Sequence, residues 1–360
     1  MRAQSTEINF NGVNVYCGID IHKKTWSVSI EVEHTHYRKS FTQPADKEAL
    51  VRFLKSHYPG ANIHAAYEAG YFGFGLYRHL TDHGITCSVL NPADIPTTHK
   101  EKDQKRDKLD SKKITRSLRV EPIRTIWVPT VSQEQDRQLL RARRAAIKDQ
   151  TRTQNRIKAL LQINDIAYPE KFQNQKASWS RRFISWLESI EFAEHSATCA
   201  LRMHIKILLH YRSCVLEFNR EIRTLSQSQR YIAVYSKLVA IGGIGVIVSM
   251  TLLTETGDVK RFKSADAFRS FIGLIPSSHS SGEKDYQGRI TPRANGHLRS
   301  LLIQSAWRAI SCNEYFCSIY TAYTKKMSGN KAIVRVAGKL ANSVYYAMKP
   351  ESQKMGSILK

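Results

Sequence analysis

The sequence predicts an α/β plus α fold, with a mixed sheet at the N-terminal end, a central region of long helices and a mostly helical C-terminal region. Residues 15–90 alternate apolar segments of strand length with segments of helical spacing. Residues 132–163 have the periodicity of one long helix, and residues 200–225 have that of a second, which could return antiparallel to the first. A chain of 360 residues can form two or three domains. We expect these to span residues 1–125, 126–232 and 233–360.

The N-terminal elements follow one another in an informative order. Three short strands come first, with only turn-like polar residues between them, which indicates an antiparallel meander. In chain order we expect strands at Val15–Ile21, Trp26–Val32 and Tyr37–Phe41, a helix at Pro44–His57, a strand at Ile63–Tyr67, a helix at Tyr71–His83 and a strand at Thr86–Leu90. This is the order of a ribonuclease-H-like mixed sheet.

The charge of the chain favours a polyanionic partner. The sequence has 55 Lys+Arg against 31 Asp+Glu, a formal net charge of +24. Neutralising phosphates releases condensed counterions, so a protein this basic is expected to bind nucleic acid. The alternative is a protein that is basic for solubility alone.

The middle of the chain concentrates this charge. The segment Lys100–Lys113 leads into a helix through Ile114 and Leu118, and Glu121–Thr130 is a predicted linker with two prolines. The long helix that follows carries cations at offsets 0, 4, 7, 11 and 15, which is one helical face: Arg137, Arg141, Arg144, Lys148 and Arg152. Such a stripe is usually a solvated face. In this chain we expect it to contact nucleic acid.

Neither the cysteines nor the apolar segments indicate export or a membrane. The six cysteines are scattered, without a CxxC pair or zinc-ligand spacing, so we expect reduced thiols and a cytoplasmic protein. The uncharged segment Leu238–Thr254 contains three glycines and falls short of the ~20 apolar residues of a membrane span. A buried helix with a glycine turn is expected there. The segment Leu238–Gly245 also resembles a helix-hairpin-helix turn, whose amides can grip a phosphate, but tight packing explains its glycines equally well.

Four carboxylates occupy positions suited to a metal site. Asp20 ends the first predicted strand and Glu68 follows the fourth, while Asp107 and Asp110 share a helix face if that segment is helical. Carboxylates that converge repel one another unless cations hold them, and Mg²⁺ prefers such oxygen ligands. Two bound ions can orient both the attacking and the leaving oxygen on phosphorus. Each acid alone is more often a cap or turn residue.

A serine far downstream offers a nucleophile. Ser281 lies in the loop-like segment Pro276–Lys284. A serine hydroxyl attacks phosphorus when it is deprotonated and cations stabilise the phosphate. From spacing alone, a flexible Ser/Gly loop is the simpler interpretation. Four basic residues follow the serine and are candidates for phosphate contact, although each could be an ordinary surface cation: Arg289, Arg293, His297 and Arg299.

Several segments, in order, resemble one family. The chain is similar to the DEDD transposases of bacterial insertion sequences, an RNA-bridged recombinase family related to the Piv DNA invertases. The resemblance covers roughly residues 15–345 and rests on the segments Tyr16–Lys23, Tyr67–Arg78, Lys105–Asp110, Ile241–Gly245, Arg261–Ser264, Phe271–Pro276, Ser280–Gly282 and Gly288–Arg293. So many ordered motifs make coincidence improbable.

The resemblance implies specific roles and partners. Asp20, Glu68, Asp107 and Asp110 would be the tetrad of a RuvC-like domain that binds Mg²⁺, and Ser281 would join covalently to a DNA phosphate. It implies dimers or tetramers, a structured guide RNA that pairs with donor and target DNA, and a place at the bacterial nucleoid. The sequence departs from the family pattern at Arg106 and Ser111, which stand where threonine and alanine are usual.

Some assignments remain open at this point. Asp103 competes with Asp107, and Ser280 competes with Ser281, although the family places its nucleophile directly before the glycine. We expect a transposase or site-specific recombinase. The alternatives are a Piv-like invertase, a Mg²⁺-dependent nuclease or junction resolvase that uses water, and a non-catalytic RNA- or DNA-binding protein.

Overall fold

The computed structural model describes residues 9–96, 107–119, 124–173, 179–281, 284–290 and 294–350. At residues 107–109, 276–281 and 284–290 it describes the backbone alone. Contacts within the chain divide it into two compact units, Met1–Pro129 and Thr130–Lys360. Each unit is described by itself.

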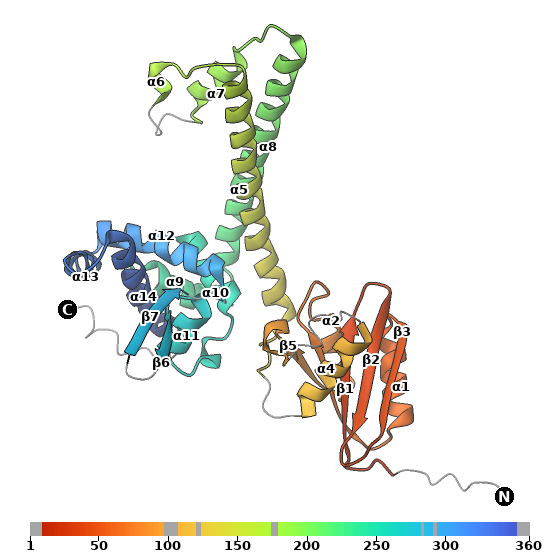
Figure 1. Ribbon diagram of the computed structural model, residues 1–360. Coiled ribbons are helices and arrows are strands. Elements are labelled where there is room, and N and C mark those ends of the chain that lie inside the picture. Colours follow the sequence, from red (N-terminus) through yellow and green to blue (C-terminus); the bar gives the residue numbers. More distant parts are fainter. Residues whose placement is uncertain are drawn as a thin grey trace, which may run out of the picture. The chain divides into compact units, whose positions relative to one another are not determined.

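The first unit is built on a five-stranded mixed sheet (Figure 1). Its strands lie in the order β3-β2-β1-β4-β5. The central strand β1 pairs antiparallel with β2 and parallel with β4. The strands are β1 (Asn14–Ile21), β2 (Thr25–Val32), β3 (Arg38–Pro44), β4 (Asn62–Glu68) and β5 (Thr86–Leu90). The predicted order of strands and helices is confirmed.

Among its described residues, this unit also has three helices and one 3-10 turn: α1 (Lys47–His57), α2 (Gly75–Asp82), η1 (Pro92–Asp94) and α4 (Asp107–Arg119). Helix α2 begins later than the predicted Tyr71, because the chain turns first at Gly73, whose φ is 65°. Asp46 caps α1 by accepting hydrogen bonds from the amides of Glu48 and Ala49.

The two faces of the sheet bury different kinds of side chain. On one face, Val15, Cys17 and Ile19 of β1 form a core with leucines of α1 and α2. On the other face, α4 packs directly on β1 and β2. The predicted alternation along β1 therefore holds, with Gly18 on the α4 side.

Helix α4 approaches the sheet closely at Gly18. A Cβ atom at this position would overlap the carbonyl oxygen of Ser111 and the hydroxyl of Thr115. The Gly18 amide donates to Thr115 Oγ1 at 3.0 Å, and this hydroxyl in turn donates to the carbonyl of Ser29. Ser111 is buried and its hydroxyl lies 3.1 Å from that of Ser29. Small polar residues thus replace an apolar helix–sheet contact here.

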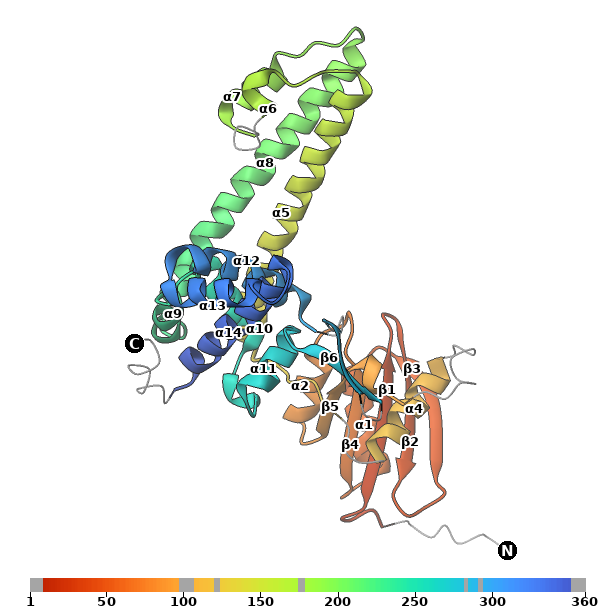
Figure 2. The ribbon, with the colours of Figure 1, turned by 60° about the vertical axis from the view of Figure 1, so that its left-hand side comes forward.

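The second unit begins with two long helices, α5 (Val131–Ile163) and α8 (His195–Ser226), which run side by side in Figures 1 and 2. Both predicted long helices are present. Near the end of this hairpin, α6 (Glu170–Gln173) and α7 (Arg181–Glu188) contribute Phe172 and Phe183 to a separate core with Ile157 and Leu201.

The remainder of the second unit is mostly helical. Its elements are α9 (Ile232–Val239), α10 (Val246–Thr256), η2 (Val259–Arg261), α11 (Ala265–Ile272), β6 (Pro276–Ser281), β7 (Lys284–Ile290), α12 (Gly296–Cys312), α13 (Glu314–Thr324) and α14 (Gly329–Met348). From Ser249 to Thr256, α10 is entirely buried. In the α9–α10 turn, Gly243 has φ 88° and a Cβ there would lie 2.6 Å from the Ser305 carbonyl oxygen of α12. Tight packing is therefore sufficient to explain this glycine.

Among the residues that the structure describes, no helix combines the length and the apolar character needed to cross a membrane.

The close approach at Gly18 gives a first prediction. Gly18→Ala should lower the free energy of unfolding by about 2 kcal/mol or more, because the new methyl group meets backbone that cannot move without displacing α4. Gly75→Ala is the matched control, since a Cβ there meets no atom within 4 Å and Gly75 opens α2. Urea denaturation of both variants measures the difference. Equal stabilities would contradict the proposed close contact.

Candidate active site and nucleic-acid interface

Three of the predicted carboxylates come together in the first unit. Asp20 lies near the end of β1 and Glu68 is the last residue of β4. Because β1 and β4 are parallel with Gly18 opposite Ala66, Asp20 and Glu68 lie on the same face of the sheet. Helix α4 covers this face and contributes Asp110. Asp107 is the first residue of α4, and its side chain lies outside the described residues.

The electrostatics of Glu68 indicate how close this cluster is. Partial burial raises the pKa of the Glu68 carboxyl, and the negative charges of Asp110 and Asp20 raise it further. The positive charge of Lys113 acts in the opposite direction but does not reverse the shift. At Glu68, therefore, neighbouring carboxylates outweigh the neighbouring cation.

Two basic side chains contact the cluster. Lys113 Nζ lies 2.8 Å from Asp110 Oδ1, and its side chain is only 9% exposed. His22 Nε2 lies 3.1 Å from Asp20 Oδ2. Since the pKa of Glu68 remains raised beside the positive charge of Lys113, the site can accommodate further positive charge. An all-oxygen set of carboxylates suits a hard divalent ion such as Mg²⁺, so the residues present fit the expected metal.

The serine segment differs from its predicted structure. It was expected to be loop-like, but β6 and β7 form an antiparallel hairpin in which Ser281 pairs with Lys284. A run of serines and histidine has no apolar alternation, so the sequence pattern did not indicate a strand. Ser281 is the last residue of β6, and its side chain and Gly282 lie outside the described residues.

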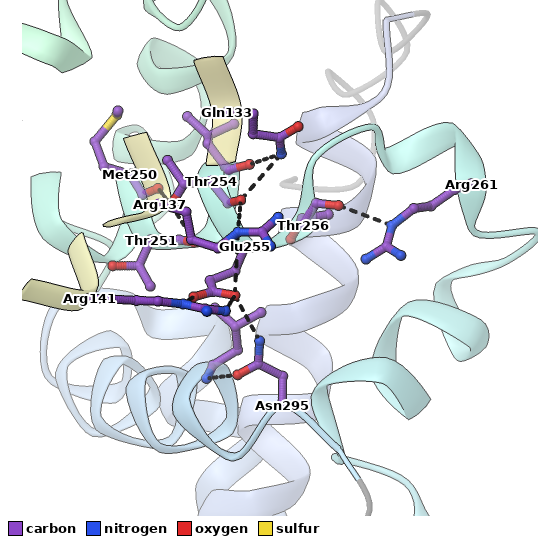
Figure 3. Close-up of polar contacts among 12 residues, drawn as sticks. Gln133, Arg137, Arg141, Met250, Thr251, Thr254, Glu255, Thr256, Arg261 and Asn295 are labelled. Atoms are coloured by element: carbon purple, nitrogen blue, oxygen red, sulfur yellow. Dashed lines mark hydrogen bonds and ion pairs between the residues drawn. The ribbon is translucent and has the colours of Figure 1, made fainter. Parts of the chain in front are cut away.

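The basic stripe on α5 has two parts with different surroundings. At its N-terminal end, Arg137 and Arg141 reach Glu255 of α10 (Figure 3). Arg141 donates from Nε and Nη2 to the two Glu255 oxygens at 2.7 and 2.9 Å. The Glu255 side chain is 5% exposed. Burial alone would raise the pKa of Glu255, but the hydrogen bonds and charge of Arg141 and the charge of Arg137 outweigh it, so the pKa is lowered.

Polar side chains also donate hydrogen bonds to backbone carbonyls at the C-terminal end of α10. Arg137 donates from Nε to the carbonyl of Thr254 at 3.0 Å, and Gln133 donates to the same oxygen at 3.2 Å. Arg261 donates to the carbonyl of Thr256 at 3.0 Å, as Figure 3 also shows. A helix end leaves such carbonyls without helical partners, and a buried one costs free energy unless it is paired. Arg137 therefore stabilises the fold of the second unit.

Further along α5, the stripe borders a cavity of about 570 Å³. Arg141, Arg144 and Lys148 line it from one side, and Asn295 and His297, at the start of α12, line it from the other. Burial and the positive charge of Arg144 lower the pKa of His297 to about 4, so the imidazole is neutral near pH 7. Glu255 also lines the cavity and pairs with Arg141, so Arg144 and Lys148, beside the N-terminus of a 17-residue helix, are the cations that make this cavity suited to an anion.

Asn295 connects the cavity to the buried ion pair. Its Oδ1 caps α12 by accepting from the Leu298 amide at 3.2 Å, and its Nδ2 donates to Glu255 at 3.4 Å. The sequence did not indicate a functional or structural contact between Glu255 and Asn295. Glu255 is the one charged residue of α10, and an isolated charge in an apolar helix is a usable signal of a buried ion pair.

The other predicted cations are dispersed. Arg152 pairs with Asp149 on the surface of α5 at 2.6 Å, and Arg299 lies in the first turn of α12. The side chain of Arg289 and the whole of Arg293 lie outside the described residues. A second basic cavity of about 520 Å³, in the first unit, lies where α4 meets β2 and β3, and its charged lining comes from Glu31, Arg38, Lys112, Arg116 and Arg119.

Comparisons with known proteins agree on one family. A model described as "Transposase IS116/IS110/IS902 family" matches residues 235–321, and a transposase model of the DEDD and IS110 type matches residues 17–164. The four predicted acids lie in the second match and Ser281 lies in the first.

Individual relatives have low sequence identity to this chain. The Sinorhizobium fredii protein y4qE is 30% identical over 68% of this chain and 58% of its own length. The transposase for insertion sequence element IS1533 of Leptospira borgpetersenii is 25% identical over 82% of this chain and 85% of its own. The pilin gene-inverting protein of Moraxella bovis is 26% identical over 81% of each chain. The aligned part thus spans less than two thirds of y4qE and most of the other two.

The buried ion pair gives a second prediction. Glu255→Ala should lower the free energy of unfolding by about 3–5 kcal/mol, because it leaves Arg137, with a side chain 13% exposed, as a buried charge without its carboxylate partner. The control Asp149→Ala removes a carboxylate from an exposed pair on the same helix and should cost less than about 1 kcal/mol. Guanidinium denaturation compares them, and similar losses for the two variants would refute this role of Glu255.

Proposed function

The chain belongs to the IS110/IS116/IS902 family of transposases, and from this premise we propose that it is an insertion-sequence transposase that cleaves and rejoins DNA. The observation that carries the proposal is the convergence of Asp20, Glu68 and Asp110 at one edge of the sheet, where the charges of Asp110 and Asp20 raise the pKa of Glu68. The raised pKa of Glu68 indicates that these carboxylates repel one another, and this repulsion disfavours the folded state. The cluster is therefore poorly suited to a purely structural role.

We infer that Asp20, Glu68 and Asp110, together with Asp107, hold Mg²⁺. Bound divalent ions would polarise the scissile phosphate and favour the ionised form of an attacking hydroxyl. Lys113 would hold the Asp110 carboxylate in place through the 2.8 Å contact, and His22 would do the same for Asp20.

The proposed nucleophile is Ser281. Its hydroxyl would lose a proton, its oxygen would bond to phosphorus, and the bond from phosphorus to the leaving deoxyribose oxygen would break, with that oxygen taking up a proton. Ser281 is the last residue of β6, and the family resemblance supports its role as the nucleophile. The family resemblance supports a dimer or tetramer in which the acids and the serine come from different copies.

Nucleic acid would be held by the cationic cavities. The cavity lined by Arg144, Lys148 and His297 is proposed to take a backbone phosphate, since the α12 N-terminus and the two cations of this cavity both favour an anion. Donor DNA, target DNA and a structured guide RNA are the proposed partners, and the formal charge of +24 supports binding of more than one strand.

A second candidate function is inversion of a DNA segment. It is favoured by the similarity to the pilin gene-inverting protein of Moraxella bovis, which extends over most of both chains. The same residues would serve both reactions, so the two differ in the DNA sites that are joined.

The serine mechanism gives a third prediction. Ser281→Ala should lower strand exchange by about 10³-fold or more and abolish a covalent protein–DNA adduct on a denaturing gel, because no other group replaces the attacking oxygen. Affinity for DNA and RNA should be unchanged. Ser280→Ala, which alters the neighbouring serine of the same strand, is the control and should retain the adduct. An adduct that persists in Ser281→Ala would exclude this serine as nucleophile.

The metal site gives a fourth prediction. Asp20→Asn should reduce Mg²⁺-dependent cleavage by about 10²-fold or more, because it removes a charged oxygen ligand from the acidic cluster. Asp149→Asn changes a carboxylate of the second unit whose side chain is 34% exposed, and it should leave cleavage unchanged. A gel assay across a Mg²⁺ titration measures both. Cleavage that continues in excess chelator would overturn the metal-dependent mechanism.

A further inference from the structure

We propose that Glu48, His79 and His83 form a transition-metal site, for which Zn²⁺ is the matching ion. One ligand atom from each residue lies within 4.8 Å of the others. The three residues belong to α1 and α2, whose apolar side chains pack on the Val15, Cys17 and Ile19 face of the sheet, whereas the acidic cluster is on the face that α4 covers. This inference does not depend on the proposed function.

The backbone places these three side chains together. His79 lies in the last turn of α2 and His83 is its C-cap, so residues four apart meet on one helix face. Their ring centroids are 4.4 Å apart. Glu48 lies in the first turn of α1, where Asp46 fixes the helix start through its bond to the Glu48 amide at 2.9 Å. The first turn of α1 and the last turn of α2 therefore bring these three side chains together.

His79 has a nitrogen that a metal ion would satisfy. Its side chain is 11% exposed, and its Nε2 is buried and makes no hydrogen bond, although Glu48 Oε1 lies 3.4 Å away. A buried ring nitrogen without a hydrogen bond costs free energy, so such a group requires an explanation. An ion placed between Nε2 and the Glu48 carboxylate would bind both atoms at once.

His83 is oriented as a metal ligand would be. Its Nδ1 lies 2.8 Å from the carbonyl oxygen of His79. A carbonyl can only accept, so Nδ1 carries the proton and Nε2 keeps a free lone pair. Metal-binding histidines are commonly held in this way, by a hydrogen bond from the other ring nitrogen to a carbonyl or carboxylate.

The donor set distinguishes this site from the acidic cluster. Two imidazoles and one carboxylate suit Zn²⁺ and its neighbours, whereas Mg²⁺ prefers oxygen ligands alone. Tetrahedral Zn²⁺ with ligands at about 2.0–2.2 Å holds them about 3.4 Å apart, which is the separation of His79 Nε2 and Glu48 Oε1. His83 ends its helix and can move closer. The fourth position would hold water.

The expected consequence is a brace between two helices. The ion would tie the first turn of α1 to the last turn of α2, which otherwise meet mainly through apolar side chains. Helix α2 follows β4 through the short segment after Glu68, so the brace would also restrict that segment. Zn²⁺ binding should therefore raise the melting temperature of the protein.

The test is calorimetric titration of the untagged, full-length protein with Zn²⁺ in excess Mg²⁺, which occupies the acidic cluster. We expect one Zn²⁺ site that weakens by about 100-fold or more in both His83→Gln and Glu48→Gln, since each loses a ligand. His36→Gln, which changes an exposed histidine outside the group, is the control and should bind as the unmodified protein does.

Co²⁺ provides a second measurement on the same variants. The unmodified protein should give the visible absorption of Co²⁺ bound to nitrogen and oxygen in a tetrahedral site, and both variants should lose it. The Glu48 side chain is 61% exposed, so Glu48→Gln is expected to fold even if His83→Gln does not. Unchanged Zn²⁺ affinity in Glu48→Gln, or no Zn²⁺ binding by the unmodified protein, would overturn the proposal.

Discussion

The close contact between α4 and β1 at Gly18 is the constraint on which the candidate active site depends. Large apolar side chains would hold a helix away from the sheet, whereas here the Gly18 amide bonds directly to Thr115 of the helix. The buried hydroxyls of Ser29 and Ser111 extend this contact. Because Asp110 directly precedes Ser111, the contact carries its carboxylate to the strand ends where Asp20 and Glu68 lie. A small polar helix–sheet seam therefore assembles the acidic cluster from distant parts of the chain.

Glu255 and the acidic cluster at Glu68 differ in how their negative charge is compensated. Glu255 is almost fully buried, but two arginines lower its pKa and hold it ionised, so it joins α5 to α10 and stabilises the second unit. Glu68 is more accessible, yet its carboxylate neighbours raise its pKa. Compensated charge inside a fold is structural, whereas excess charge of one sign at an accessible edge is suited to a ligand of the opposite sign. This contrast supports a metal ion at the sheet edge.

The sequence was most informative where one residue pattern determines the structure. Alternation predicted the strands of the first unit, and helical periodicity predicted α5 and α8. Features that depend on distant partners could not be predicted in this way. The spacing of Arg137 and Arg141 predicted a contact with nucleic acid. Their ion pair with Glu255 becomes visible only in the fold, because Glu255 lies far along the chain. The β6–β7 hairpin is polar and gave no strand pattern. The proposed metal site at His79 and His83 could not be predicted from the sequence, because its third ligand, Glu48, comes from α1.

The central claim is that α4 brings three carboxylates together to hold a divalent ion. Crystals of the full-length protein grown with Mn²⁺ in place of Mg²⁺ would test it through anomalous scattering. The account predicts an anomalous peak bounded by carboxylate oxygens of Asp20, Glu68 and Asp110. Ordered carboxylates that point apart, with no peak among them while Mn²⁺ binds elsewhere on the protein, would contradict it.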